Sequence, residues 1–426
     1  MIGLALLALF YAGALGSSQR DLAWFVPLTL LQGALFVAGA AIAFRSQARR
    51  SSALIVVTFA VLFRAVAVVA VPFASTDIYR YVWDGRVISA GINPYSYRPA
   101  DPHLRALRDA SVYPNINRKA TARTIYPPVA EGVFYLATRF GGVTAMKVTM
   151  TCFDIAAGLL LMRLLYLSGI PVQRILLYAW HPLIVWEFAG NGHVDAIAVA
   201  FIAAAVLAYR YDRALLVGAA LAAATLVKFL PALLLAPLYR RWDWKAPFAF
   251  VAVAASLYIP FLSAGARVAG YLPGYAREEG IDSGERFYLL NIFHTILHID
   301  VPPLLYIAGS VLVLGLLWVA AVRTDSKQTH LREAFLLTIA TAVTVFLSPA
   351  YPWYFAWLVP LCVLFNSRAV LYLTLVCPIL YVRELFDSAP LILVLDTVLF
   401  VPAIVLAVRS IVRHRGSVLQ ILEAHV

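Results

Sequence analysis

The sequence predicts an all-α polytopic membrane protein, and three observations support this prediction. Hydrophobic residues make up 62% of the 426 positions and charged residues only 13%, whereas about a quarter of the residues in a soluble domain are charged. The mean hydropathy is +0.83. Apolar segments recur along the whole chain, so we expect a single integral membrane domain over 1–426, without a separate soluble domain.

The transmembrane helices follow from the lengths of the apolar segments. A hydrocarbon core of about 30 Å needs roughly 20 helical residues, and about 12–14 segments qualify as spans. The expected spans are 2–17, 23–44, 52–73, 143–167, 174–189, 195–209, 214–228, 229–239, 246–264, 302–322, 333–348, 352–366, 369–383 and 390–412. We expect the first of them to be retained, because neither a basic n-region nor a small-residue cleavage site accompanies it.

Two regions are less regular than the others. The pair 214–228 and 229–239 is also compatible with a shallow re-entrant hairpin around Pro231. Segment 127–140 is short, begins with two prolines and contains a glutamate. For it we expect a helix that lies at the membrane interface rather than across the membrane.

The distribution of basic residues predicts the orientation of the chain. One set of short loops contains basic clusters such as Arg45, Arg49 and Arg50, whereas the opposite set contains only Arg20 and Arg383. By the positive-inside rule, the basic set and both termini are cytoplasmic in a cell inner (plasma) membrane. Topology and attraction to anionic membrane lipids therefore explain the net charge of +12, and no nucleic-acid partner is indicated.

This orientation places two long loops, 74–142 and 265–301, on the periplasmic or extracytoplasmic side. Interfacial helices are expected in the first of these loops. The short turns 189–195 and 348–354 also fall on this side. All chemically suggestive segments thus share one face of the membrane, and we expect the active site there.

A charged and aromatic cluster follows the third expected span. The stretch "STDIYRYVWDGRVISAGINPYSYRP", residues 75–99, contains Asp77, Arg80, Asp84 and Arg86. In a helix the first three of these share a face. An ionised carboxylate can accept a proton from a sugar hydroxyl, and nearby guanidinium groups keep it ionised. The alternative interpretation is a salt-bridge lattice that anchors the loop.

Polar residues also occur at the start of the expected span 195–209. Asn191, His193 and Asp195 lie in the turn "AGNGHVD". Asn191 or Asp195 could simply cap a helix. Capping explains neither His193 nor the Gly-Asn-Gly sequence, which would let a ligand approach the backbone.

Three charged residues interrupt apolar segments. Lys228 would cost roughly 2.5–3.5 kcal/mol at the bilayer centre, so it is expected to face a cavity and an anionic partner such as a phosphate. Snorkelling to the interface is the alternative. Arg64 and Asp154 could be partners of each other, and we favour such a structural pair over the alternative of a role in substrate binding.

Aromatic and proline-rich stretches complete the set of candidates. Tyr126 lies in "TIYPPVAEG", and Tyr351 and Trp353 lie in "SPAYPWYFAWLVP". They belong either to the interfacial aromatic belt or to a surface that contacts sugar and isoprenoid. The chain contains no GxGxxG, P-loop, HExxH or paired CxxC motif, which leaves a soluble nucleotide-sugar site unsupported. Its three cysteines lie in apolar runs and predict no disulfide framework or thiolate metal site.

Taken in order, these motifs resemble the GT-C superfamily of polytopic glycosyltransferases, which use polyprenyl-phosphate-linked sugars. The chain is similar to bacterial polyprenyl-phosphate-mannose mannosyltransferases and to the catalytic subunit of glycosylphosphatidylinositol mannosyltransferase I. The matching pieces are "TDIYRYVWDGRVISAGINPY" (76–95), "YPPVAEGVF" (126–134), "FDIAAGLLLMRLL" (153–165), "WHPLIVWEFAGNGHVDAIAV" (180–199), "LVKFLPALLL" (226–235) and "SPAYPWY" (348–354).

The resemblance implies roles for several residues. Asp77 matches the proposed catalytic base at the start of the first large outer loop, and Asp84 is the remaining acid close to it. Lys228 and His193 would face the donor phosphate. The 265–301 loop, which contains Arg286, would close over the donor.

The chain also departs from the related anchor enzyme at one position of this motif. Tyr79 stands where that enzyme has a second adjacent acid. A metal bridged by two neighbouring carboxylates is therefore not favoured, and we expect no cofactor, although divalent-metal dependence remains open.

The resulting hypothesis is an inverting transfer of a hexose, expected to be mannose. The donor would be a polyprenyl-phosphate-linked sugar, and the acceptor a hydroxyl of a glycan or glycolipid. Two other classes stay open: a lipid or sugar transporter, and a non-catalytic membrane subunit of a transferase complex. Turnover by the purified chain with a radiolabelled polyprenyl-phosphate sugar would distinguish the enzyme from both.

The orientation can be tested with single cysteines at Arg98 and Ser326. The charge distribution predicts that Arg98 is extracytoplasmic and Ser326 cytoplasmic. A membrane-impermeant thiol label applied to intact cells should therefore react at Arg98 alone. Labelling of both positions from the same side would contradict the topology.

Overall fold

The computed structural model describes the chain except for residues 46–49, 282, 285, 349, 387 and 424–426. The described residues form helices and loops and contain no strand. Seven of the described segments are long and apolar enough to cross a membrane: Ile2–Gln19, Leu22–Arg45, Val143–Leu167, Lys245–Ala269, Pro303–Arg323, Thr329–Leu347 and Ala389–Val412. The prediction of an all-α polytopic membrane protein is thereby confirmed.

The remaining expected spans are shorter or broken. Three shorter apolar helices cover Ala53–Val69, Ala214–Thr225 and Pro352–Phe365. The expected spans 174–189, 229–239 and 369–383 consist of short α-helical, 3₁₀ and π-helical pieces. Breaks in a membrane-depth helix are tolerated where the freed backbone groups are buried in protein.

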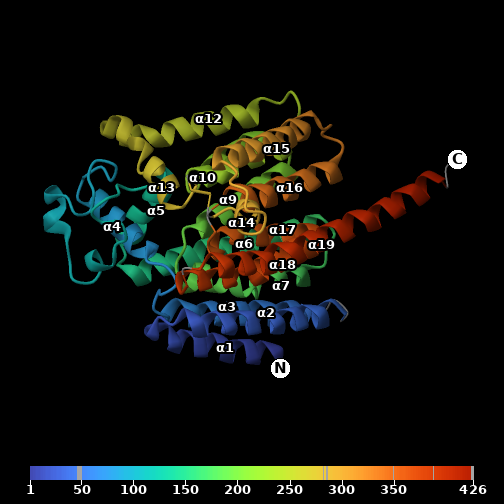
Figure 1. Ribbon diagram of the computed structural model, residues 1–426, viewed down its shortest axis with the longest axis horizontal. Coiled ribbons are helices and arrows are strands. Elements are labelled where there is room, and N and C mark those ends of the chain that lie inside the picture. The colour runs from blue at the N-terminus through green and yellow to red at the C-terminus, as the bar shows by residue number, and fades with distance from the viewer. Residues whose placement is uncertain (46–49, 282, 285, 349, 387, 424–426) are drawn as a thin grey trace.

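The helices form layers, as Figure 1 shows. Along one edge α1 (Ile2–Gly16) packs on α2 (Leu22–Arg45) and α3 (Arg50–Val69). Toward the opposite edge lie α12 (Lys245–Tyr258) and α15 (Pro303–Arg323).

Several helices lie between these two edges of the bundle. The helices between them are α6 (Val143–Leu167), α9 (Asp195–Arg210), α10 (Ala214–Thr225), α16 (Thr329–Leu347), α17 (Val359–Phe365) and α18 (Arg368–Val376). Helix α9 packs between α6 and α10, and α10 packs on α12. The last helix, α19 (Ala389–Glu423), packs on α18.

The 74–142 loop forms a compact unit at one end of the bundle (Figure 1). It contains α4 (Asp77–Ser89) and α5 (Pro128–Thr138). Asp77 in the first turn of α4 complements the helix dipole, and Pro128 occupies the first position of α5, where a missing N–H is harmless. Helices α4 and α5 approach closely at Gly85. A Cβ at this position would meet the carbonyl oxygen of Phe134, so the close approach requires a glycine.

A backbone hydrogen bond ties this unit to the helical bundle. The Val129 N–H donates to the carbonyl of Leu226, just after α10, at 3.1 Å. The chain beyond α10 continues as a 3₁₀ helix (Leu230–Leu234) and the short helix α11 (Leu235–Leu238). The unit and the turn that contains Lys228 are thereby held next to each other.

The predicted pairing of Arg64 and Asp154 is confirmed. Arg64 Nε lies 2.6 Å from Asp154 Oδ2, and Arg64 Nη2 lies 3.0 Å from Oδ1. Both side chains are buried. This bidentate ion pair joins α3 to α6 within the apolar layer.

Removing one member of this pair should destabilise the protein strongly. Arg64→Leu leaves the Asp154 carboxylate buried without its cation, which typically costs about 3–5 kcal/mol, whereas an apolar replacement of the whole pair is often neutral. We therefore expect a clear fall in Tm for Arg64→Leu in detergent, and recovery in Arg64→Leu/Asp154→Leu. A double variant that melts as low as the single variant would contradict this account.

Candidate functional site

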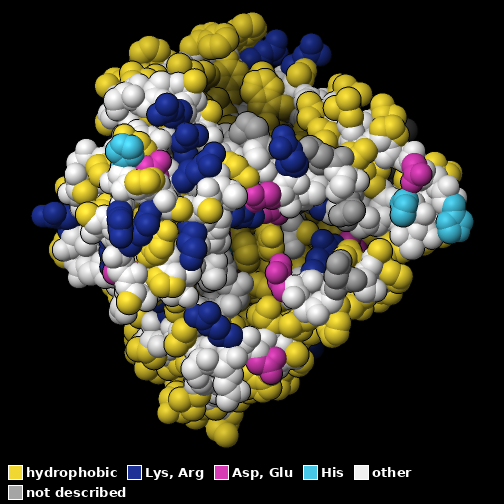
Figure 2. Space-filling model, turned by 60° about the vertical axis from the view of Figure 1, so that its left-hand side comes forward, with side chains coloured by type: hydrophobic (Ala, Val, Ile, Leu, Met, Phe, Trp, Pro, Cys, Tyr) yellow, Lys and Arg dark blue, Asp and Glu magenta, His cyan; other side chains and the backbone are white. Residues whose placement is uncertain are grey.

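A cavity of about 640 Å³ lies where the two long loops meet the ends of the apolar helices. Figure 2 shows this face, with a hollow near its centre and acidic and basic side chains around it. The predicted candidates that line the cavity are Asp77, Arg80, Tyr126, Lys228, Tyr351 and Trp353. Segments far apart in the sequence thus converge on one site, as expected from their shared face.

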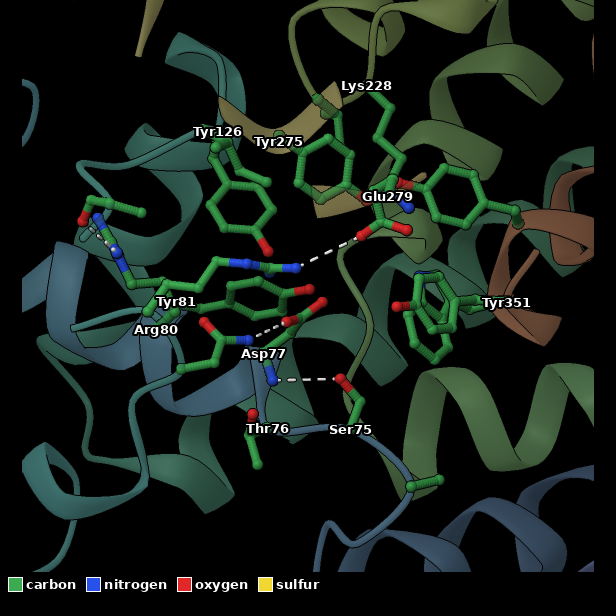
Figure 3. A pocket seen from close by; sticks show the side chains of 18 of the residues that line it. Ser75, Thr76, Asp77, Arg80, Tyr81, Tyr126, Lys228, Tyr275, Glu279 and Tyr351 are labelled. Carbon is green, nitrogen blue, oxygen red and sulfur yellow. Dashed lines mark hydrogen bonds and ion pairs between the residues drawn. The ribbon is translucent and has the colours of Figure 1, made fainter. Parts of the chain in front are cut away.

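The cavity has two differently built sides. In Figure 3, Asp77, Tyr81 and Tyr126 of the first long loop lie on one side. Lys228 and Tyr351 lie on the other. A molecule in the cavity would therefore contact both sides at once.

Asp77 is the first residue of α4 and is half-buried in the cavity wall. Its Oδ1 accepts a hydrogen bond from Asn117 Nδ2 at 2.7 Å, and its backbone N–H donates to Ser75 Oγ at 3.2 Å (Figure 3). The partner of the carboxylate is thus a neutral amide, which holds its orientation without neutralising its charge.

Arg80 forms an ion pair with Asp84 rather than with Asp77. Its Nε lies 2.9 Å from the carboxylate of Asp84, and both side chains are buried. Burial raises the pKa of Asp84, against the opposing effect of the Arg80 charge. Asp84 is absent from the cavity wall that the described residues form. It can therefore act on the site through Arg80.

A second buried acid lies next to this pair. Glu131 of α5 accepts a hydrogen bond from the Thr124 hydroxyl at 2.6 Å. Burial, together with the nearby Asp84 carboxylate, raises the pKa of Glu131 well above its usual range. One proton held by this pair of acids would leave the trio with Arg80 close to electroneutral, which would suit its dry surroundings.

Arg86 points away from Asp77 as well. Its Nη1 lies 2.6 Å from Asp109 Oδ2. Although partial burial opposes the shift, the hydrogen bonds from Arg86 and from the Val112 and Tyr113 N–H groups lower the pKa of Asp109. Arg80 and Arg86 therefore form ion pairs, as the salt-bridge interpretation expects. Asp77 takes part in neither of these two pairs.

Lys228 lines the cavity and forms an ion pair with a carboxylate behind it. Its Nζ lies 2.8 Å from Asp195 Oδ1 and 3.7 Å from the centre of the Tyr354 ring. The capping role considered for Asn191 or Asp195 is wrong, because α9 follows Val194 without a side-chain cap. Asp195 instead holds Lys228 at the cavity wall.

Asn191 and His193 lie behind the wall rather than in it. Asn191 Nδ2 donates to Glu187 Oε2 at 3.1 Å, and the His193 ring stacks on Trp353 at 4.3 Å. The expectation that Gly192 lets a ligand approach the backbone is also wrong. Gly192 has a φ of +72°, and a Cβ there would meet side-chain atoms of Ile78 and Lys147.

Arg286 likewise lies outside the cavity wall, as far as the described residues form it. Its Nη1 donates to the backbone carbonyl of Glu279 at 3.2 Å. It therefore supports the segment of the second loop that does reach the cavity.

Sequence reasoning missed a contact between the two long loops. Arg118 forms ion pairs with Glu278 and with Glu279, the latter at 3.4 Å, and lies 5.5 Å from the centre of the Tyr275 ring. Arg118, Tyr275 and Glu279 all line the cavity. No spacing rule connects positions so far apart, although the acidic pair in "REEGIDSGERFY" was a visible signal.

The cavity also has apolar walls and a further cation. Leu22, Phe73, Phe229 and Leu230 line it together with Arg123. The Arg123 Nε donates to a backbone carbonyl, that of Ser96, at 3.3 Å. The site thus combines the carboxylates of Asp77, Glu279 and Glu384 with several cations, aromatic rings and an apolar border.

No group of three His, Cys, Asp or Glu side chains that could hold a metal ion occurs among the described residues. This observation does not test metal dependence. The expectation that the protein needs no cofactor therefore remains a prediction.

The described residues thus form a polytopic helical membrane protein with a cavity of apolar, aromatic and charged side chains at its loop-bearing end. Residues 5–242 match the family described as alpha-(1->6)-mannopyranosyltransferase, N-terminal domain, and the chain belongs to this family. No curated protein and no solved structure shows significant similarity to it. Family membership confirms the mannosyltransferase resemblance. The match includes Asp77 and Lys228 but ends before the second long loop.

Proposed function

We propose that the protein is a GT-C type mannosyltransferase that uses a polyprenyl-phosphate-linked mannose as its donor. The acceptor is a hydroxyl of a glycan or glycolipid, and transfer takes place on the extracytoplasmic side of the inner membrane with inversion at the anomeric carbon. The observation that most supports this proposal is the position of Asp77, a carboxylate with an amide partner in a cavity that also contains cations and apolar side chains.

The composition of the cavity wall matches the parts of such a donor. Leu22, Phe73, Phe229 and Leu230 in the cavity wall offer apolar contacts for the first isoprene units. Lys228 next to them offers a positive charge for the phosphate. The sugar would then occupy the polar part of the cavity near Asp77.

The second long loop would cover the bound donor. Its residues Tyr275 and Glu279 already line the cavity, and Arg118 links them to the first loop. Enclosure would exclude water, which would otherwise compete with the acceptor hydroxyl.

The chemical step is a single displacement. Asp77 takes the proton of the acceptor hydroxyl while the acceptor oxygen forms a bond to the anomeric carbon. The bond from that carbon to the phosphate oxygen breaks, and its electron pair leaves with the polyprenyl phosphate. Positive charges such as Lys228 stabilise the negative charge that develops on the phosphate. Attack opposite to the leaving group inverts the anomeric configuration.

Lys228 is expected to serve donor binding as well as local stability. Lys228→Met leaves Asp195 buried without its cation and should lower Tm, whereas Lys228→Met/Asp195→Asn removes both charges and should recover most of it. Both variants should bind a short-chain prenyl-phosphate mannose more weakly, because neither presents a cation to the phosphate. Donor affinity that returns together with Tm in the double variant would show that Lys228 acts on folding alone.

Asp77 is expected to be the general base. Asp77→Asn keeps the shape and most of the hydrogen bonding but cannot take a proton, so turnover should fall about 10²–10⁴-fold with donor affinity and Tm preserved. Asp84→Asn is the control: it should lower turnover less and should also lower Tm, because Arg80 loses its buried partner. The measurements are turnover with radiolabelled donor, donor affinity and Tm. Near-normal turnover of Asp77→Asn would refute the mechanism.

A further inference from the structure

Glu187 is a buried carboxylate for which neither the sequence nor the proposed mechanism accounts. It lies in a π-helical turn, Val185–Gly190, and is 1% exposed. Such turns are rare and often occur at functional sites. An acid buried among apolar residues is unfavourable unless polar partners surround it, so its partners indicate what it holds in place.

Two of these partners are aromatic side chains. The Tyr381 hydroxyl donates to Glu187 Oε1 at 2.8 Å. His193 Nε2 lies 3.4 Å from Glu187 Oε2, and the His193 backbone N–H donates to the Glu187 carbonyl at 2.8 Å. The Glu187 carboxylate therefore holds Tyr381 by a hydrogen bond and contacts the His193 ring without one, whereas its backbone carbonyl restrains the His193 backbone.

Both aromatic partners pack against Trp353. The His193 ring stacks on Trp353 with a centroid distance of 4.3 Å and an interplanar angle of 17°. The Tyr381 ring lies 6.2 Å from Trp353 at 42°. Tyr351 stacks on Trp353 at 4.5 Å and 5° and lines the cavity with it. The three nearly parallel rings of His193, Trp353 and Tyr351 form a stack that connects the interior to the cavity.

We propose that the open face of Tyr351, backed by Trp353, is the surface on which the transferred hexose rests, and that Glu187 is the positioning residue that fixes this surface through His193 and Tyr381. The inference rests on the proposed function and adds the place of the sugar to it. The electron-rich face of an aromatic ring attracts the polarised C–H groups of a hexose. Tyr351 lies across the cavity from Asp77 (Figure 3), so a sugar on this surface would lie between the ring and the base.

The test compares the binding of two probes, a short-chain prenyl phosphate with mannose and the same compound without it. The ratio of their dissociation constants isolates the contribution of the sugar. In Glu187→Gln we expect this ratio to fall by roughly three- to tenfold, about the value of one aromatic contact. Affinity for the sugar-free probe should not change, and KM for the donor should rise more than kcat falls.

A double-variant cycle distinguishes positioning from general support of the fold. Trp353→Leu should lower the sugar-dependent ratio by itself, and adding Glu187→Gln should lower it no further, because residues that act as one unit are not additive. Additive losses, an unchanged ratio in Glu187→Gln, or equal weakening of both probes would each overturn the proposal.

Two further variants keep the test decisive. Tyr381→Phe removes one hydrogen bond to Glu187 and should lower the ratio in the same direction, even if Glu187→Gln fails to fold. Asp154→Asn also removes a buried carboxylate charge, but one that pairs with Arg64 and not with the stack, and it should lower Tm without changing the ratio.

If the ratio depends on Glu187 in a chain that shows no turnover, the proposed function fails while the sugar surface stands. If turnover is normal and the ratio does not respond to Glu187, the surface assignment alone fails.

Discussion

The neutralisation of charge at membrane depth is the constraint on which the rest of the structure depends. A charge without a partner in an apolar layer is expensive, and Arg64 and Lys228 each have a carboxylate partner, from α6 and α9. These contacts do more than balance charge, because they fix the helices and turns that form the cavity wall. The Lys228 pair in particular ties the turn after α10 to the start of α9.

Against this background Asp77 is the exception that gives the site its chemistry. The side-chain hydrogen-bond partner of its carboxylate is the neutral amide of Asn117 and not an arginine. Arg80 and Arg86, which lie on the same helix as Asp77, pair instead with Asp84 and Asp109.

The sequence was informative wherever a polar or aromatic residue stands at the end of an apolar run. This rule, supported by the family resemblance, placed Asp77, Tyr126, Lys228, Tyr351 and Trp353 on one face, and the structure places them around one cavity. Partners were harder to predict than positions, because pairing depends on how helices distant in sequence pack. The acidic pair at Glu278 and Glu279 is visible in the sequence, but no spacing identifies Arg118 as its partner, and the glycines near Asn191 make room for side chains, not for a ligand.

The breaks in the helices and the polar residues that escaped prediction have a common cause. The expected span 174–189 is apolar enough to predict a continuous helix, yet the chain forms short pieces and a π-helical turn there. A regular helix aligns side chains at fixed intervals, whereas a wider turn changes the direction in which Glu187 points. Its carboxylate can then meet Tyr381 and His193 at the same time. A hydropathy average over such a segment does not reveal the direction of a single side chain. The role of Glu187 behind the cavity wall can therefore be inferred only from the packed structure.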